Sequence, residues 1–581
     1  MNNPLDFPIR NPAVKWFIEW FTALGILKRW YQDWIGLSVE RRDSAAFLEY
    51  TLGRLDAGLD IGPAERLEDI PKNGPVMFIS NHPLGGLDGM LLTRKLLEIR
   101  PDLKVLTNEH LLIFPEFSDI FIGVNVLSDD ARHANSAGIR QLGKHLGKGG
   151  AVLFFPGKIV SQIQLPSMKI ADLKWTPMIA RLARRYNATC VPIFVKARNP
   201  ISFYLAKFIH RRLRTALLIR AMLSKRGKTI QAVMGTPIPA TDIENFSDVG
   251  AATDYLRMSC DLLDQDAATA GASTAQSEIN PDVEKSLLRE QVHKLSKYLQ
   301  LKDGPFQVYC VPYAELGCVM KQIAICRERA FRAIDAGSGK EIDKNRFDPY
   351  YWHLFVWDDE NAQIAGGYRL EKADRIAELY GVDSMCSQSV YRYDRKFIGQ
   401  LGKAIELSRS FVTPEYQLHP KVLDLLWKGI ARCVVANPGY HTLFGPVSIP
   451  PKYSLLARSF LADAFLTHYS ANRDLCDGVL PVSPLDVTDR PWTKELVDAA
   501  SDIPFINRLL GRIDDGKSIP ILIRRYLALN GKFIAFGVND GFNKSLDGLI
   551  VVDLRQAPEK YLKRYLGVNE IREIHGMELQ D

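Results

Sequence analysis

The sequence predicts an α/β protein with two domains. The chain has 581 residues, which is too long for a single hydrophobic core. Short apolar runs alternate with helical segments in its first half, as they do in α/β domains. A small, polar segment at 264–282 has the composition of a flexible linker. We therefore expect one domain over 1–264, a linker over 265–282 and a second domain over 283–581.

The elements expected in the first half follow a repeating strand–helix pattern. The apolar run 76–79 is typical of a short buried strand and ends in turn residues. Further strands are expected at 104–107, 151–155, 190–195 and 229–234, with helices at 89–100 and 177–186. This alternation predicts a largely parallel sheet.

The second half also mixes strands and helices. Residues 351–357 and 363–370 predict a hairpin, because they bracket the polar turn 358–361. The remaining expected elements are a helix at 421–436 and strands at 406–412, 441–447, 532–537 and 548–554.

The composition excludes several classes of protein. Its 46% hydrophobic and 24% charged residues are typical of a globular protein rather than of a disordered chain. The eight cysteines form no C-x-x-C pair and no zinc-like spacing, so we expect reduced thiols in a cytoplasmic protein and no metal site. No uncharged run is long enough to span a bilayer. Asp6 and Arg10 precede any apolar segment, so no signal peptide is expected. A net charge of only +7, without a nucleic-acid module pattern, argues against nucleic acid as a partner.

Two basic, amphipathic segments are expected to meet a lipid surface. Residues 13–34 combine four tryptophans with Lys15, Lys28 and Arg29, a composition that suits the headgroup boundary. Residues 196–228 hold ten Lys or Arg and no Asp or Glu, which suits an anionic membrane surface or an acidic carrier protein. We expect a peripheral protein on the cytoplasmic face of the inner membrane. The alternative for 13–34 is an ordinary helix packed at the edge of a domain.

The turn after the strand at 76–79 carries the clearest chemistry. His82 stands at the strand end, and Asp88 follows six positions later across Gly85 and Gly86. A carboxylate can hold one imidazole nitrogen protonated and leave the other free to take a proton from a hydroxyl or an amine. We therefore predict a general base and its orienting partner. The alternative is a histidine and an aspartate that only cap the turn.

Four segments of the first half, in order, resemble the blocks of the glycerolphosphate and lysophospholipid acyltransferase family. The His-x4-Asp motif of that family is similar to the run from Asn81-His82 to Asp88, which has one extra residue. This longer form with two glycines resembles a bacterial branch often called hemolysin-like. The other blocks are matched by Phe121-Ile122-Gly123 with Asn125 in place of an arginine, by 154–158, and by Val191-Pro192-Ile193 with Asn199. The run 154–158 resembles Phe-Pro-x-Gly but is shortened and lacks the usual acidic residue.

This resemblance implies transfer of a fatty acyl group from acyl carrier protein or coenzyme A to a hydroxyl. His82 would be the base and Asp88 its orienting partner. The residues that would contact the acceptor are Asn81, Phe155, Pro156, Gly157 and Lys158. The backbone N–H groups of Gly85 and Gly86 could receive oxyanion charge. The departures in the second and third blocks suggest an acceptor without a glycerol phosphate.

The second half has a constellation of charged residues of its own. Its members are Arg327, Phe331, Glu341, Asp343, Phe347, Asp348, Arg369, Glu406 and Arg409. Charged side chains in predicted strands are costly to bury unless they are paired, so Arg369, Glu406 and Arg409 indicate a polar site. On a regular strand, positions 406 and 409 point to opposite faces and need not touch each other.

These residues resemble the N-acyltransferase fold shared by acyl-homoserine lactone synthases and ornithine lipid synthases. The matching segments are Tyr368-Arg369-Leu370, Glu406-x-Ser408-Arg409, Leu426-Trp427-Lys428-Gly429 and Leu443-Phe444-Gly445, which are closer to the latter. The coenzyme A pyrophosphate loop of ordinary GNAT enzymes is absent, and only Pro414-Glu415-Tyr416 lies near its expected position.

The resemblance implies an acyl donor on acyl carrier protein and a role for each matched residue. Glu406 would be the base or the ammonium anchor. The residues that would bind substrate are Arg327, Asp343, Asp348, Arg369 and Arg409. The alternative is a purely structural ion network.

Together, the two halves resemble the bifunctional ornithine lipid synthases. The implied reaction is N-acylation of ornithine with a 3-hydroxyacyl group from acyl carrier protein, followed by O-acylation of the 3-hydroxyl. No bound cofactor is expected, because acyl-acyl carrier protein or acyl-CoA is a co-substrate. Three alternatives remain open. They are the same chemistry on glycine or another amino acid, a lysophospholipid acyltransferase fused to a separate N-acyltransferase, and a non-catalytic, hemolysin-like membrane-binding protein.

Overall fold

The computed structural model divides the chain into two compact units. The first comprises Met1–Asp266 with Pro491–Ala499, and the second comprises Ala267–Arg490 with Ala500–Asp581. The structure describes residues 3–5, 11–37, 43–124, 136–164, 169–209, 214, 216–264, 276–485, 490–514 and 516–575. Asn125, Arg211, Arg212 and most of the predicted linker, 265–275, lie outside the described residues.

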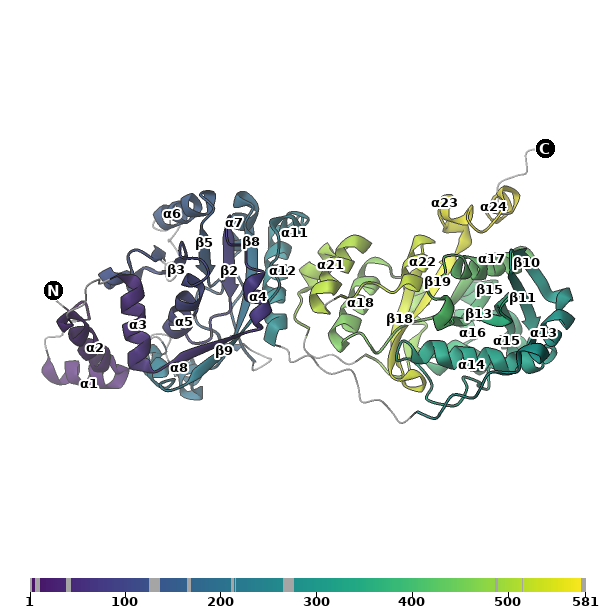
Figure 1. The fold of residues 1–581 in the computed structure, drawn as a ribbon, viewed down its shortest axis with the longest axis horizontal. Helices are drawn as coiled ribbons and strands as arrows, with labels where there is room; N and C mark the ends of the chain where they lie inside the picture. The colour runs from purple at the N-terminus through teal and green to yellow at the C-terminus, as the bar shows by residue number, and fades with distance from the viewer. Residues whose placement is uncertain are drawn as a thin grey trace. The chain divides into compact units, whose positions relative to one another are not determined.

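The first unit is built on a seven-stranded sheet in the order β1-β9-β8-β2-β5-β3-β4 (Figure 1). Its strands are β1 (Gly58–Gly62), β2 (Val76–Ser80), β3 (Lys104–Asn108), β4 (Phe121–Val124), β5 (Ala151–Phe154), β8 (Thr189–Lys196) and β9 (Thr229–Met234). Neighbours run parallel except β8 and β9, which are antiparallel. Every residue of β2 is buried, as expected for a central strand of a sheet covered on both faces. The α/β prediction for this half is confirmed.

Helices pack on this sheet and on one another. They are α1 (Pro12–Thr22), α2 (Leu24–Gly36), α3 (Ser44–Leu55), α4 (Ala64–Glu68), α5 (Gly86–Leu97), α6 (Ser136–Gly147), α7 (Met178–Tyr186), α8 (Ile201–Ile209), α10 (Leu218–Leu223), α11 (Ala240–Glu244), α12 (Val249–Asp261) and α20 (Lys494–Ala499). The small ribbon β6 (Gln162–Gln164) and β7 (Lys169–Ala171) lies outside the main sheet. Among all the helices that the structure describes, none is long and apolar enough to cross a membrane.

Helix α5 positions the first predicted site, and its sequence explains how it docks. Leu87, Leu91, Leu92 and Leu96 recur at helical spacing and are fully buried in the core of the unit. Four buried leucines contribute several kcal/mol, at about 1.5–3 kcal/mol per fully buried side chain. The start of α5 is therefore held firmly at the end of β2.

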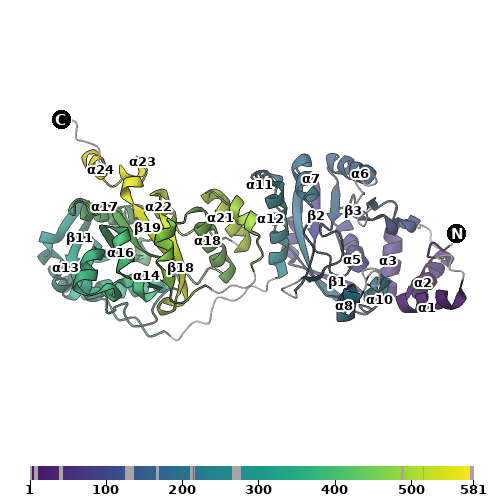
Figure 2. The same cartoon turned by 180° about the vertical axis from the view of Figure 1, so that it is seen from behind.

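The second unit contains an eight-stranded sheet in the order β10-β11-β12-β13-β15-β16-β19-β18 (Figure 2). Its strands are β10 (Leu299–Asp303), β11 (Phe306–Pro312), β12 (Trp352–Asp358), β13 (Gln363–Lys372), β15 (Ala404–Val412), β16 (Thr442–Ile449), β18 (Lys532–Asn539) and β19 (Ser545–Asp553). Neighbours are antiparallel except β15 and β16, which pair in parallel over Ala404–Glu406 and Thr442–Phe444. The predicted hairpin is β12–β13, and this half is also α/β.

The helices of the second unit pack on this sheet and around its ends. They are α13 (Lys285–Lys294), α14 (Cys318–Arg332), α15 (Ala373–Leu379), α16 (Arg395–Leu401), α17 (Val422–Val435), α18 (Leu455–His468), α19 (Arg473–Asp477), α21 (Ile503–Ile513), α22 (Ile521–Ala528), α23 (Glu559–Leu562) and α24 (Val568–His575), with the short ribbon β14 (Tyr391–Arg392) and β17 (Leu480–Pro481). Helix α14 packs on β13 and β15, and α17 packs on β11, β12 and β13. The side chain of Arg369 lies on the face that carries Arg327 of α14.

Candidate functional site

The first candidate site lies at the carboxyl end of β2, where the chain turns into α5. His82 follows the strand by two residues, and Asp88 lies in the first turn of the helix. The His82 Nδ1 and Asp88 Oδ1 atoms are 3.0 Å apart. The predicted pair is therefore in direct contact.

The Asp88 carboxylate is held in place by the backbone. Its Oδ2 accepts the N–H groups of Leu84 (2.8 Å) and Gly85 (3.3 Å), and Oδ1 accepts that of Gly89 (2.8 Å). The side chain is fully buried, while that of His82 is 19% exposed. A fixed carboxylate on Nδ1 leaves Nε2 as the nitrogen that can take a proton from a substrate.

The electrostatics of His82 suit a base. Burial of the ring lowers its pKa, but the carboxylates of Asp88 and Asp172 outweigh burial and raise the pKa above 6.5. A stronger base is the consequence, and the imidazolium that forms on proton transfer is stabilised by the same carboxylates.

The two glycines of the turn have different roles. Gly85 has a φ of 83°, which strains any other residue, and a Cβ there would press on Leu218 Cδ2 (3.0 Å) and Val160 Cγ2 (3.2 Å). Its N–H is already bonded to Asp88. Gly86 begins α5, a position whose N–H has no partner within the helix, and its Cα faces open space. Of the two predicted oxyanion donors, Gly86 is the better placed.

The remaining residues predicted for this site divide into lining and structural ones. The Phe155 ring lies 4.4 Å from the His82 ring, centroid to centroid. Lys158 is exposed in a left-handed conformation, whereas Pro156 and Gly157 are buried. Asn81 joins strands, because its amide Nδ2 donates to Val195 O (3.1 Å) and its Oδ1 accepts the N–H of Val195 (2.7 Å).

One of the two further blocks of the resemblance also reaches the turn. Residues 191–193 lie in β8 and pair with β2 directly before His82. Asn199, which follows β8, donates its side-chain N–H to Pro83 O at 2.9 Å. Phe121-Ile122-Gly123 lies in the edge strand β4. The block at 191–199 therefore reaches the β2–α5 turn, whereas the block at 121–123 lies three strands away from β2 in the sheet.

The second candidate site is a buried ion network on β13 and β15. Asp348 Oδ1 lies 2.9 Å from Arg327 Nη1 and 3.0 Å from Arg369 Nη1, and all three side chains are at most 1% exposed. Burial alone would raise the pKa of Asp348, but the two guanidinium groups hold it well below its usual value. The same cations and burial lower the pKa of the neighbouring His353 to about 3.

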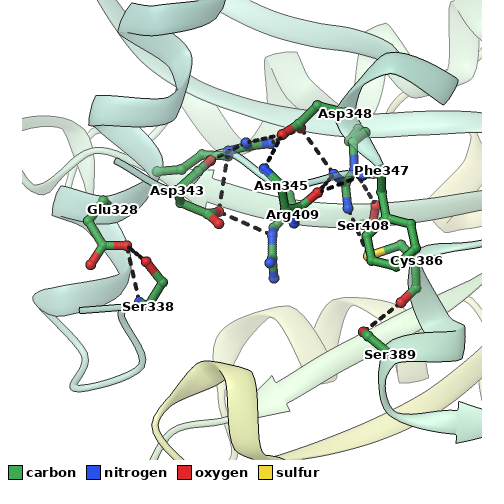
Figure 3. Close-up of polar contacts among 12 residues, drawn as sticks. Glu328, Ser338, Asp343, Asn345, Phe347, Asp348, Cys386, Ser389, Ser408 and Arg409 are labelled. Carbon is green, nitrogen blue, oxygen red and sulfur yellow. Dashed lines mark hydrogen bonds and ion pairs between the residues drawn. The ribbon is translucent and has the colours of Figure 1, made fainter. Parts of the chain in front are cut away.

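Asp343 extends this network to Arg409 at its edge (Figure 3). The Asp343 Oδ2 atom lies 3.3 Å from Arg327 Nε and 3.1 Å from Arg409 Nε. Arg409 is 18% exposed and packs over the Phe542 ring at 4.5 Å. Its φ of 53° departs from a regular strand, so simple alternation along β15 does not govern this residue.

Glu406 lies at the other end of the same network. Its Oε1 accepts the N–H (2.8 Å) and the hydroxyl (2.5 Å) of Ser387, and its Oε2 accepts the Tyr351 hydroxyl and the N–H of Cys386 (3.3 Å). Cys386 Sγ in turn accepts from Arg369 Nη2 at 2.7 Å. These contacts join Glu406 to Arg369 and fully occupy its carboxylate. The geometry describes an anchor of the 386–387 turn more directly than a base.

The structure brings together residues that the sequence did not single out. In the second unit these are Asn345, Tyr351, His353, Cys386 and Ser387, all of which touch the network. In the first unit, Asp172 and Ser161 touch His82. Phe331 belongs to the hydrophobic core, where its ring packs on Phe542 at 4.7 Å. Glu328, next to Arg327, turns away to the Ser338 loop (Figure 3).

Comparison with known proteins assigns a family model to each site. Residues 58–270 match a family described as "Acyltransferase", and residues 326–428 match the "Acetyltransferase (GNAT) domain" family. The protein is an acyltransferase. The first match contains the His82–Asp88 pair, and the second contains the whole network from Arg327 to Arg409. Among the described residues, no cluster of three His, Cys, Asp or Glu side chains is arranged to hold a metal ion.

Individual relatives of this acyltransferase are named for two reactions. A glycine N(alpha)-acyltransferase of Phocaeicola vulgatus is 27% identical over 306 residues, which covers 50% of this chain and 92% of the relative. A glycine N(alpha)-acyltransferase of Bacteroides thetaiotaomicron is 28% identical over 277 residues, 45% of this chain and 80% of the relative. A lyso-glycine lipid O-acyltransferase of Phocaeicola vulgatus is 28% identical over 200 residues, 33% of this chain and 68% of the relative.

Proposed function

We propose that this acyltransferase makes an aminolipid by two successive acyl transfers in one chain. The observation that carries the proposal is that this one chain is similar both to relatives named as N-acyltransferases and to other relatives named as O-acyltransferases. The two family matches cover separate segments, one in each compact unit. Each unit also holds a polar site of its own.

The first transfer belongs to the second unit. The α-amine of an amino acid attacks the carbonyl of a 3-hydroxyacyl thioester, so the C–N bond forms, the C–S bond breaks and the amine proton leaves with the thiol. Arg409 lies at the exposed edge of the ion network and suits the amino acid's carboxylate. Asp343 lies next to Arg409, and its carboxylate suits an N–H hydrogen bond from the amino acid's amine.

Ornithine is the amino acid that the proposal takes first, because the fused arrangement resembles ornithine lipid synthases. Glycine is the second candidate, and the names of the relatives favour it. Acyl carrier protein is the proposed donor, because a short 3-10 helix, Pro414–Tyr416, follows β15 where a coenzyme A loop is expected.

The second transfer belongs to the first unit. The 3-hydroxyl of the N-acyl product gives its proton to His82 Nε2 as its oxygen attacks a second acyl thioester. The C–O bond forms, the C–S bond breaks, and the imidazolium returns the proton to the departing thiolate. Asp88 stabilises the imidazolium throughout, because its carboxylate is fixed 3.0 Å from Nδ1.

A lipid surface is the proposed location of the first unit. Helix α1 exposes Trp16, Phe17 and Trp20, each more than half exposed, and α8 exposes Ile201 and Leu205. Arg220 joins α10 to α1, since it donates to the backbone of Trp20 and Phe21 and packs over the Trp20 ring. A hollow of about 740 Å³ between α1, α2 and α10 is lined by cations that suit anionic headgroups, among them Lys15, Arg29 and Arg220.

Lipid analysis of the full chain in a heterologous host tests the proposal. We expect a new phosphorus-free lipid with two acyl chains, and its headgroup identifies ornithine or glycine by mass. His82→Ala should accumulate the single-chain N-acyl product, and Arg409→Ala should lose both products. A new lysophospholipid-derived product would favour two unrelated acyltransferases. If none of these lipids forms with the wild-type chain, the non-catalytic membrane-binding alternative stands.

A further inference from the structure

A second buried carboxylate, that of Asp172, lies beside His82. Asp172 Oδ1 accepts the backbone N–H of His82 (3.3 Å) and the hydroxyl of Ser161 (2.6 Å), and Oδ2 accepts Trp175 Nε1 (3.2 Å). The Asp172 side chain is only 6% exposed. It is separated from His82 by 90 residues and reaches the site from the segment after β7.

The residues on either side of the β6–β7 ribbon bind both backbone polar groups of His82. The N–H of His82 is bonded to Asp172, and the C=O of His82 accepts the N–H of Ser161 at 2.9 Å. Ser161 and Asp172 flank the β6–β7 ribbon and are bonded to each other. The backbone position of His82 is thus set independently of the contact between its ring and Asp88.

The same carboxylate shapes the third block. A Cβ on Gly157 would lie 2.9 Å from both Cγ and Oδ2 of Asp172, so a side chain at this position would displace the carboxylate. Gly157 follows Phe155, whose ring packs on the His82 ring. Asp172 therefore contacts both the loop that lines the His82 ring and the backbone of His82.

The charge of Asp172 also acts on the base. Burial raises the pKa of Asp172, while Ser161, His82 and Trp175 lower it. The negative charge of Asp172 is one of the causes that raise the pKa of His82, after Asp88. The other titratable groups around Asp172 come from α12 and are Arg257, which donates to its backbone O, Cys260 and Asp261.

We propose that Asp172 is a positioning residue for O-acyl transfer. It fixes the backbone of His82, seats the loop at Gly157 and adds negative charge behind the base. This inference rests on the proposed role of His82 in ester formation.

The test compares pH profiles of ester formation by the full chain, with a purified N-acyl acceptor and an acyl thioester donor. Asp172→Asn preserves the shape of the side chain and removes its charge. We expect its kcat/KM to fall roughly tenfold or more, because a positioned base contributes about 10²–10⁴-fold. We also expect the acid limb of the profile to move to lower pH.

Two control variants separate charge from packing. Ser161→Ala removes one hydrogen bond and keeps the Asp172 charge, so it should lower the rate without moving the acid limb. Asp261→Asn removes a neighbouring carboxylate whose partner is Arg257, so it should leave the profile in place. An unchanged rate and profile for Asp172→Asn, or a lower rate with an unmoved limb, would overturn the inference.

The outcome for His82→Ala distinguishes this failure from failure of the proposed function. An inactive His82→Ala with a wild-type Asp172→Asn rejects only the role of Asp172. Full ester formation by His82→Ala rejects the proposed function of the first unit itself.

Discussion

Asp88 joins the His82 ring to the backbone of its own turn. One oxygen lies 3.0 Å from His82 Nδ1 and also accepts the N–H of Gly89, while the other accepts the N–H groups of Leu84 and Gly85. The side chain thus orients the imidazole and stabilises the start of α5 at the same time. Its removal should affect both catalysis and folding, whereas removal of the imidazole should affect catalysis alone.

Comparison of His82→Ala with Asp88→Ala tests this double role. We expect both variants to lose ester formation. Only Asp88→Ala should also lower the free energy of unfolding, by about 1–2 kcal/mol, because it removes the acceptor for three N–H groups at the start of the helix. Urea unfolding and product assays on the same preparations measure the two effects. Equal destabilisation by both variants would contradict the prediction.

The pH dependence of ester formation should report the environment of His82. The base acts as neutral imidazole, and its pKa lies above 6.5 because the carboxylates of Asp88 and Asp172 outweigh burial. The rate should therefore fall as the pH drops through a value above 6.5. Asp88→Asn removes the carboxylate with the larger effect on the pKa of His82 and should move this acid limb to lower pH. A wild-type limb below pH 6.5 would contradict the prediction.

Local patterns in the sequence correctly predicted those features that lie within a single segment of the chain. The apolar run 76–79 became β2, the predicted helix at 421–436 is α17 (Val422–Val435), and the His82–Asp88 pair is in contact. In each case the contacts that define the feature lie within a few residues or follow from one hydrophobic pattern. The two α/β sheets followed from the same patterns.

Features that depend on contacts between distant segments could not be predicted from local sequence patterns. The strand β1 (Gly58–Gly62) has two apolar residues and lies at the sheet edge, so its pattern is weak. Asp172 reaches His82 from 90 residues away, and nothing near it in sequence indicates a site. The contacts of Glu406 with Cys386 and Ser387 depend on how a loop folds over β15. Tertiary packing alone determines such contacts.

The buried ion network should make the second unit sensitive to acid. Asp348 is fully buried between Arg327 and Arg369, and they hold its pKa below the ordinary 3.8 despite burial. A group with a lowered folded-state pKa contributes its stability above the unfolded value and loses it as the pH falls through the folded value. We therefore expect a loss of stability from Asp348 below about pH 4, measurable by circular dichroism during acid titration.

Substitution of Asp348 tests the same network at neutral pH. Asp348→Asn leaves two buried guanidinium groups without their shared carboxylate and should cost about 3–5 kcal/mol of unfolding free energy. Asp383→Asn, at an exposed position of the same unit, serves as the matched control and should cost less than about 0.5 kcal/mol. Similar small costs for both variants would show that the network contributes little to stability.

Exposed aromatic and aliphatic side chains of the first unit should determine binding to lipid vesicles. Trp16 is 67% exposed on α1 and Ile201 is 73% exposed on α8, and Arg220 of α10 holds the end of α1. Trp16→Glu and Ile201→Glu should each weaken binding to anionic vesicles about tenfold or more, because each removes at least ~1.4 kcal/mol of burial at the interface. Val568→Glu, at a position 57% exposed in the second unit, is the matched control and should bind as the wild type does. Lys15, Arg29 and Arg220 line the adjoining hollow and are expected to attract anionic headgroups. Raising the ionic strength from 0.1 M to 1 M should therefore also weaken binding of the wild type, because the screening length falls from about 10 Å to about 3 Å. Equal loss in the Val568→Glu control, or binding by Trp16→Glu equal to that of the wild type, would show that this face does not meet the membrane.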